Sequence, residues 1–347
     1  MHRVVVGAVK TAVALLLCVA FPALAAEPPA RAWLTSDTVE SLALRERVAA
    51  PLAEAAEEQL RAGKPLAASY AAEACLSIDR YRCSCIRDSG RARAKIKSED
   101  AATLATVRAN AWPQLMEYVS CDETADDAPP VFALAKKWSS SRYPYPLQPV
   151  PRATLEAKES KVLLAEGNAL FAELVPLPAK RRFELCAQRE PVNCSCARRA
   201  GDTWLKLEDR ERAIVWWSRY LDCLPTAADR ASVSRDIAAA RTALTSNPIW
   251  DGVLSVPSSP IAAFVEMAST HLGKARRAVK EKRLDDALVS FTVCQLLDPA
   301  AWDCSVLLAD TLDQLGRRED ARVVRVRLLD RLPRSHPLRP SISARLQ

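Results

Sequence analysis

The cysteines of this chain form a pattern that repeats along the sequence. The groups are Cys75, Cys83 and Cys85, then Cys186, Cys194 and Cys196, then Cys294 and Cys304. The shift along the sequence that takes one group onto the next is nearly the same in both steps. Cysteine thiols form disulfides, bind metals or carry out redox chemistry, depending on spacing and compartment. A pattern at a nearly fixed period indicates that one structural unit is used three times.

The chemistry that fits these cysteines best is disulfide formation. The chain contains no Cys-x-x-Cys, and its only histidines beyond the first few residues are His271 and His336. Structural zinc sites use closely spaced Cys and His residues, and thiol oxidoreductases use the Cys-x-x-Cys turn to lower a thiol pKa. We therefore expect no metal site, no redox activity and no cofactor.

The first 26 residues are typical of a cleavable secretory signal. An apolar stretch from Thr11 to Phe21 is too short to span a bilayer, and Ala23 to Ala25 supplies small residues for cleavage. An uncleaved anchor is a competing interpretation, as is lipidation at Cys18, which the bulky Leu17 before it disfavours. Removal of the signal leaves ten cysteines, an even number, in a periplasmic or extracellular compartment where disulfides persist.

A shorter period lies inside the larger one. The same interval separates Pro191 from Pro225, Pro299 from Pro333, Ala179 from Ala213, and Ala287 from Ala321. Ala179, Phe183 and Cys186 have the i, i+4, i+7 spacing of one helix face. Only 8 of the 347 residues are glycine, which also favours helices over strands and tight turns. The sequence therefore predicts an all-α fold.

This shorter module resembles the tetratricopeptide repeat (TPR), a helix–turn–helix unit of about 34 residues with small residues where its helices cross and Pro at its end. The small residues are Gly167, Gly201, Ala275 and Ala309. The strongest copies are Ser160 to Asn193 and Ala268 to Ala301, and another copy follows each directly. Arg325 stands where the family usually has an aromatic residue, and Arg80 replaces the closing Pro of the first unit. The resemblance implies a TPR-like α-solenoid of three two-repeat units, stapled by disulfides as in Sel1-like repeats.

The comparison of the three units, with the helix layout of the resemblance, predicts how the cysteines pair. The third unit keeps only Cys294 and Cys304, so these two should bond, and the equivalent cysteines of the other units by analogy. The remaining four cysteines lie at the start of one helix and the end of the next, which are close in an antiparallel hairpin. The predicted pairs are Cys75–Cys85, Cys186–Cys196, Cys294–Cys304, Cys83–Cys121 and Cys194–Cys223. Trp302 and Arg331 occupy the places of the last pair in the third unit.

Prolines and aromatic residues divide the chain into units. We expect a signal peptide over 1–26, helical units over 27–127, 152–245 and 263–333, linkers over 128–151 and 246–262, and a loose tail over 334–347. Six prolines in 128–151 exclude a continuous helix there. Trp138, Tyr143 and Tyr145 favour packing across a neighbouring groove, although an extended spacer is the alternative.

Charge and motifs exclude several classes of function. The net charge of +7 is mild, and basic residues alternate with acidic ones, which does not favour nucleic-acid binding. The chain has no Ser-x-x-Lys, Gly-x-Ser-x-Gly, His-Glu-x-x-His or phosphate-binding Gly-rich loop, and histidine, the commonest general base, is scarce. We expect no enzyme; a Sel1-like enzyme acting on cell-wall-related substrates is the minority alternative.

The TPR resemblance implies a scaffold that binds a protein or peptide. Together with the signal peptide, it predicts an exported scaffold in the cell envelope, with a structural part of an envelope assembly as the alternative. In the family, the first helices of successive modules line a concave binding surface. The candidate contact residues on that surface are Lys161, Asn168, Phe171, Arg198, Asp202, Arg276 and Asp310. We expect the mature chain to have no membrane span.

Overall fold

The computed structural model describes residues 38–96, 111, 113–122, 124–138, 149–246 and 262–346. All regular secondary structure in these ranges is helical. The predicted signal peptide and two aromatic residues of the predicted linker, Tyr143 and Tyr145, lie outside the described residues. Within the described ranges, no helix combines the length and the apolar character needed to cross a bilayer.

The helices group into three units, which we call units one, two and three. Unit one contains α1 (Thr38–Arg61), α2 (Pro65–Ile78), α3 (Cys83–Lys95), a helix over 113–121 and α5 (Ala128–Trp138). Unit two contains α6 (Arg152–Glu156), α7 (Ser160–Ala172), α8 (Pro176–Arg189), α9 (Cys194–Lys206), α10 (Arg210–Cys223) and α11 (Arg230–Ser246). Unit three contains α13 (Ala262–Lys280), α14 (Leu284–Leu297), α15 (Trp302–Gln314), α16 (Arg318–Arg331) and α17 (Arg339–Ala344).

One type of turn joins α1 to α2, α7 to α8, α9 to α10, α13 to α14, and α15 to α16. Each turn holds one residue in the left-handed region, with φ between 59° and 76°: Gly63, Leu174, Glu208, Lys282 and Gly316. The next amide donates to a carbonyl five residues back, as Asp209 N does to Trp204 O at 3.0 Å and Arg317 N to Leu312 O at 2.8 Å. This hydrogen bond is that of the Schellman motif, which ends a helix and reverses the chain.

Small residues allow the two helices of a pair to cross closely. A Cβ atom at Gly167 would lie 2.6 Å from the ring of Phe183, and one at Gly201 would lie 2.3 Å from the ring of Trp217. Both aromatic residues are buried, as is Phe291 of unit three. The glycine and aromatic residues therefore act together, since the ring fills the space that a side chain would take. The repeated turns and crossings make the fold TPR-like.

The described residues contain five disulfides. Three of them join the second helix of one pair to the first helix of the next, and all six of their cysteines are fully buried: Cys75–Cys85, Cys186–Cys196 and Cys294–Cys304. The other two, Cys83–Cys121 and Cys194–Cys223, tie the start of one helix to the end of the following one. The structure thus contains the pairs expected from the sequence. In unit three, the Arg331 guanidinium lies over the Trp302 ring at 5.6 Å, where unit two has its second disulfide.

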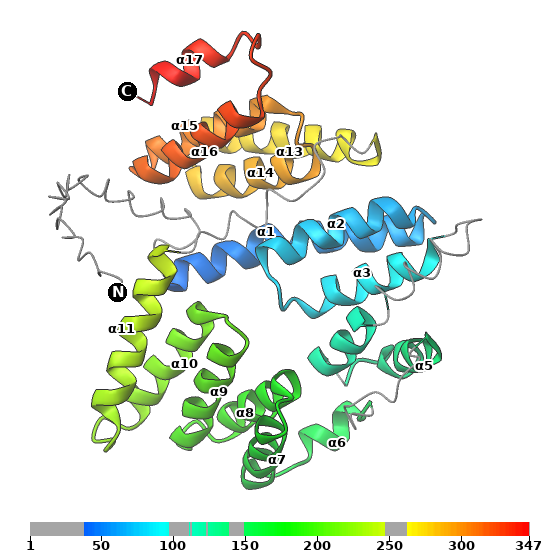
Figure 1. Cartoon of the computed structure of the whole chain (residues 1–347), viewed down its shortest axis with the longest axis vertical. Coiled ribbons are helices and arrows are strands. Elements are labelled where there is room, and N and C mark those ends of the chain that lie inside the picture. Colours follow the sequence, from blue (N-terminus) through cyan, green and yellow to red (C-terminus); the bar gives the residue numbers. More distant parts are fainter. Residues whose placement is uncertain are drawn as a thin grey trace, which may run out of the picture.

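The units do not stack in the order of the chain. Helix α1 contacts α10 of unit two and α14 of unit three, so unit one lies between the other two (Figure 1). Units one and three share one hydrophobic core, in which the Tyr70 and Phe264 rings lie 5.8 Å apart. The Tyr70 hydroxyl also donates to the carbonyl oxygen of Leu296 at 2.8 Å.

Two segments differ from the sequence expectation. The first part of the expected linker is helix α5, because Pro129 and Pro130 fall in its first turn, where a missing amide hydrogen costs little. Its buried Val131 and Ala135 belong to the same hydrophobic cluster as buried residues of the helix over 113–121. The expected loose tail contains α17, whose buried Ile342 belongs to the same cluster as residues of α16.

Candidate functional site

The predicted contact residues of α7 lie at different depths. Lys161 is exposed and pairs with Glu159 at 2.8 Å, just before the helix. Asn168 is exposed as well. Phe171 is half-buried against the cluster of Ala179 and Phe183 in the next helix. The α7 face therefore offers polar groups to solvent above a partly buried ring.

The predicted contact residues of α9 take part in an ion-pair network within the chain. Arg198 donates to Asp202 on the same helix and lies 3.4 Å from the carboxylate of Asp229, which precedes α11. The Trp217 indole of α10 donates to Asp202 at 3.0 Å. Burial raises the pKa of Asp202, while Arg198 and the Trp217 hydrogen bond oppose that shift. Arg198 and Asp202 therefore connect α9 to α10 and to the start of α11.

The predicted contact residues of unit three are also paired within the chain. Arg276 lies 3.1 Å from Asp303, in an exposed pair. Asp310 accepts hydrogen bonds from Arg325 of α16, at 3.1 Å, and from Arg345, which follows α17. The predicted residues therefore do not converge on one site. Most of them hold neighbouring helices together.

A buried cluster of charges, which was not predicted from the sequence, joins units one and two. Arg45 of α1 lies 2.5 Å from Glu211 and 3.4 Å from Asp209, at the start of α10. Arg212 lies 2.8 Å from Asp79, which follows α2, and 2.8 Å from Asp209. The signal for this cluster was Arg45 itself, because it shares a helix face with apolar residues, and buried charges require partners.

The pKa values of Glu211 and Asp79, two carboxylates of this cluster, are shifted in opposite directions. Burial raises the pKa of Glu211, although Arg45 and a hydrogen bond from the Ser41 hydroxyl, at 2.7 Å, act against burial. Burial alone would also raise the pKa of Asp79, but Arg212 and Arg45 outweigh burial and lower it. The two guanidinium groups therefore hold Asp79 in its charged form.

Aromatic residues lie beside this charged cluster. Trp204 of α9 packs edge-on against Tyr81 of unit one, with 5.8 Å between ring centroids. Lys180 and Arg212 each place a cation 4.8 Å from the centre of the Trp204 ring. The Tyr81 hydroxyl donates to the carbonyl oxygen of Leu207. Rings, cations and carboxylates together position units one and two at their junction.

A pocket of about 360 Å³ opens at the same junction, and we call it the inter-unit pocket. Unit one contributes two residues before α3 and three from the helix over 113–121, while unit two contributes the start of α8 and the end of α9. The lining residues are Arg80, Tyr81, Pro113, Glu117, Ser120, Val175, Pro176, Leu177, Pro178 and Leu207. Most of this lining is apolar, and Glu117 is its one acidic residue.

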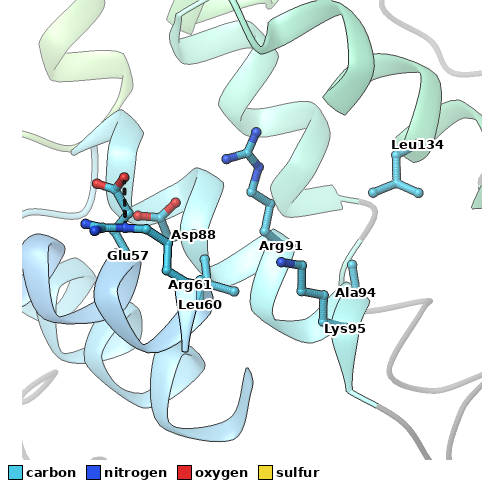
Figure 2. Close-up of a pocket in the computed structure, with 8 residues that line it drawn as sticks. All are labelled: Glu57, Leu60, Arg61, Asp88, Arg91, Ala94, Lys95 and Leu134. Atoms are coloured by element: carbon cyan, nitrogen blue, oxygen red, sulfur yellow. Dashed lines mark ion pairs between the residues drawn. The ribbon is translucent and has the colours of Figure 1, made fainter. Parts of the chain in front are cut away.

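A second hollow, of about 400 Å³, lies between α1, α3 and α5 (Figure 2). Its aliphatic residues are Leu60, Ala94 and Leu134. Most of its charged residues already have partners within the chain. Arg61 lies 3.8 Å from Glu57, Arg91 lies 2.6 Å from Asp127, and Asp88 lies 2.7 Å from Arg87. Among the described residues, no group of His, Cys, Asp and Glu side chains could hold a metal ion.

No family model and no curated protein matches this chain. Among solved structures, it is similar to PilF of Pseudomonas aeruginosa, with 11% identity, a TM-score of 0.21, and coverage of 86% of this chain and 98% of that one. It is also similar to the TPR domain of P58(IPK), with 12% identity, a TM-score of 0.24, and coverage of 81% and 83%. At these values neither similarity carries an argument. The description of the chain as a TPR-like stack of disulfide-linked helix pairs rests on its own repeated turns, helix crossings and disulfides.

Proposed function

We propose that this chain is an exported, non-enzymatic TPR-like scaffold that binds a protein or peptide partner in the cell envelope. The observation that supports this most strongly is rigidity. Five disulfides and a buried charge cluster hold the helix pairs in place. A preorganised surface loses little conformational entropy when a partner binds, which favours affinity.

Export to the periplasm or the exterior belongs to the same proposal. Disulfides form and persist in oxidising compartments and are rare in the cytosol. Five of them, three with fully buried cysteines, are typical of such a compartment. The predicted signal peptide agrees with this location.

The contact surface that we propose is the exposed face of α7. Lys161 and Asn168 lie on the first helix of their pair, the helix that lines the concave surface in the TPR family. Arg198 and Asp202 are poor probes of partner binding, because their ion pairs join α9 to its neighbours and a substitution would disturb the helix packing.

Affinity capture tests this proposal. The oxidised chain from Glu27 onward serves as bait for an envelope and secreted-protein extract, with mass spectrometry as the readout. We expect a saturable partner, and the double variant Lys161→Ala/Asn168→Ala to weaken its capture about tenfold, the effect of losing about 1.4 kcal/mol at an interface.

The control is Gln188→Ala, an exposed amide on the second helix of the same pair. It should leave capture unchanged, and circular dichroism should show equal helicity in all variants. Failure of the wild-type chain to capture a saturable partner would refute the scaffold proposal. Equal capture by the double variant would refute only the α7 surface.

A further inference from the structure

The inter-unit pocket is built from segments that are fixed to one another. Pro113, Glu117 and Ser120 are spaced i, i+4 and i+7, so one face of their helix forms a wall. The Cys83–Cys121 disulfide holds the end of that helix against the start of α3. The hydrogen bond from Tyr81 to Leu207 holds unit two on the opposite side. The pocket is therefore a preformed site.

Glu117 is the unusual residue of this pocket. It is half-buried, and within the described part of the chain it makes no ion pair and no side-chain hydrogen bond. Burial raises the pKa of its carboxyl, and Arg80 is the one cation that acts against burial. The Arg80 guanidinium is engaged elsewhere, 3.6 Å from Glu208 and 5.5 Å from the centre of the Tyr81 ring.

An unpaired carboxylate in an apolar pocket favours a cationic ligand. Transferring the carboxylate out of water costs free energy, and a cation placed beside it recovers part of that cost. The rest of the ligand must be apolar to fit the walls formed by Val175, Leu177 and Leu207. An alkyl chain with a terminal positive charge meets both requirements.

Lysine fits this description better than arginine. Its side chain is an unbranched apolar stem with a compact ammonium group, which needs only one carboxylate oxygen. Arginine gains from stacking its planar guanidinium on an aromatic ring, but Arg80 already lies over Tyr81. Lysine is therefore preferred, because the pocket offers an unpaired carboxylate but its aromatic ring is already covered by Arg80.

We propose that the inter-unit pocket receives a lysine side chain of the partner protein, with its stem between Leu177 and Leu207 and its ammonium group at Glu117. This inference rests on the proposed function for the origin of the lysine. The pocket lies at the junction of units one and two, apart from the α7 contact residues Lys161 and Asn168. A partner that reaches both sites would span more than one unit.

The test is a calorimetric titration of the oxidised chain with Nα-acetyl-lysine methylamide and with its norleucine analogue, which has a similar stem and no charge. We expect the lysine compound to bind with a Kd of about 1 mM, the range for a ligand of this size. The norleucine compound should bind the wild-type chain about tenfold more weakly or worse. The lysine compound should bind the Glu117→Gln variant with a similar loss of affinity. Glu156→Gln removes the same charge from an exposed position on α6 and should bind like the wild type.

Three results would overturn the inference. These are no lysine binding at about ten times the expected Kd, equal binding of the norleucine compound, and unchanged lysine binding to Glu117→Gln. Equal unfolding temperatures of the two glutamine variants would show that any loss of lysine binding comes from the pocket and not from unfolding of the chain. The titration needs no partner, so binding of the lysine compound without partner capture would refute the proposed function alone. Capture of a partner without lysine binding would refute the pocket alone.

Discussion

Trp217 of unit two and Arg325 of unit three occupy equivalent positions in the repeat. One is aromatic and the other is charged, but both donate a hydrogen bond that links the two helices of a pair. Trp217 donates to Asp202 from the second helix of its pair, and Arg325 donates to Asp310 in the same way. The interval between the two donors along the sequence equals the interval between the two acceptors. Arginine can therefore stand where the TPR family usually has an aromatic residue, because the carboxylate on the first helix accepts from either donor.

This equivalence separates the predicted contact residues into two kinds. Asp202 and Asp310 are acceptors that hold the two helices of a pair together. Lys161 and Asn168 lie on an exposed surface. We therefore base the partner proposal on the second kind.

The glycine at the helix crossing gives a test at the scale of a residue. In Gly201→Ala the new Cβ would lie 2.3 Å from the ring of Trp217, which is buried and cannot move freely. We expect a loss of about 1–3 kcal/mol in the free energy of unfolding, as for other overpacked cores. Urea unfolding followed by circular dichroism measures this change.

Gly273→Ala is the matched control, because Gly273 lies within α13 and a Cβ there would have no neighbour within 4 Å. It should stabilise the chain by about 0.5–1 kcal/mol, since alanine favours helix more than glycine does. Destabilisation of equal size in both variants would contradict the crossing argument.

At the scale of elements, the five helix pairs of the described chain share a turn whose left-handed residue is glycine in only two cases. Gly63 and Gly316 adopt positive φ at little cost, while Leu174, Glu208 and Lys282 adopt it against the steric preference of a side chain. The turn is therefore imposed by the two helices and not by its central residue. This is the reason that the module is recognisable without a glycine pattern at the turn.

Lys282→Gly tests that interpretation. Lys282 is exposed, and its φ is 59°, so glycine removes backbone strain and loses little packing. We expect a gain of about 0.5–1 kcal/mol, because the relief of roughly 1–2 kcal/mol is partly offset by the greater freedom of glycine in the unfolded chain. Thermal unfolding of the oxidised chain is the measurement.

The reciprocal variant is Gly316→Ala, where φ is 76° and a Cβ would meet nothing within 4 Å. It should lose about 1 kcal/mol through the backbone alone. If Lys282→Gly lowered the stability instead, the turn would depend on the lysine side chain and not on its backbone conformation.

At the scale of the whole molecule, α1 holds the three units together by two different kinds of contact. Unit three shares an apolar core with unit one, supported by an exposed ion pair of 2.5 Å between Arg47 and Asp286. Unit two meets unit one through the buried charge cluster around Arg45. The two junctions should therefore respond differently to the loss of an arginine from α1.

Arg45→Met and Arg47→Met form a matched pair for this test. Each removes one guanidinium from α1 that pairs with another unit, but the side chain of Arg45 is 10% exposed and that of Arg47 is 45% exposed. We expect Arg45→Met to cost about 3–5 kcal/mol, because Glu211 would stay buried without its cation. Arg47→Met should cost about 1 kcal/mol or less.

Urea unfolding measures the difference, and hydrogen exchange locates it. In Arg45→Met, the amides of α1 and α10 should lose protection first, while those of α15 and α16 should keep it. Equal costs for the two variants, or loss of protection spread evenly over the chain, would contradict a junction that depends on the buried cluster.

The sequence alone was sufficient for the helix pairs, and the sequence with the helix layout of the TPR resemblance was sufficient for the inter-helix disulfides. Both depend on residues close together in the chain: a turn and its flanking helices lie within one repeat, and Cys186 and Cys196 are only 10 apart. Local periodicity carries such information because helical spacing and antiparallel hairpins follow directly from it. Proline content does not predict helix α5, because proline is tolerated in the first turn of a helix and its position in that turn depends on where the helix begins.

Only the tertiary structure decided the order of the units, the charge cluster and the inter-unit pocket. These depend on contacts between distant segments, such as Arg212 with Asp79, 133 residues apart, and Arg47 with Asp286, 239 apart. Their residues have no regular spacing that would relate one to another. Arg198, Asp202 and Asp310, which the TPR resemblance places on a binding surface, instead pair within their own units, with one another or with the next helix. A charged side chain on a helix face is free or paired according to which helix packs against it, and that is settled by three-dimensional packing.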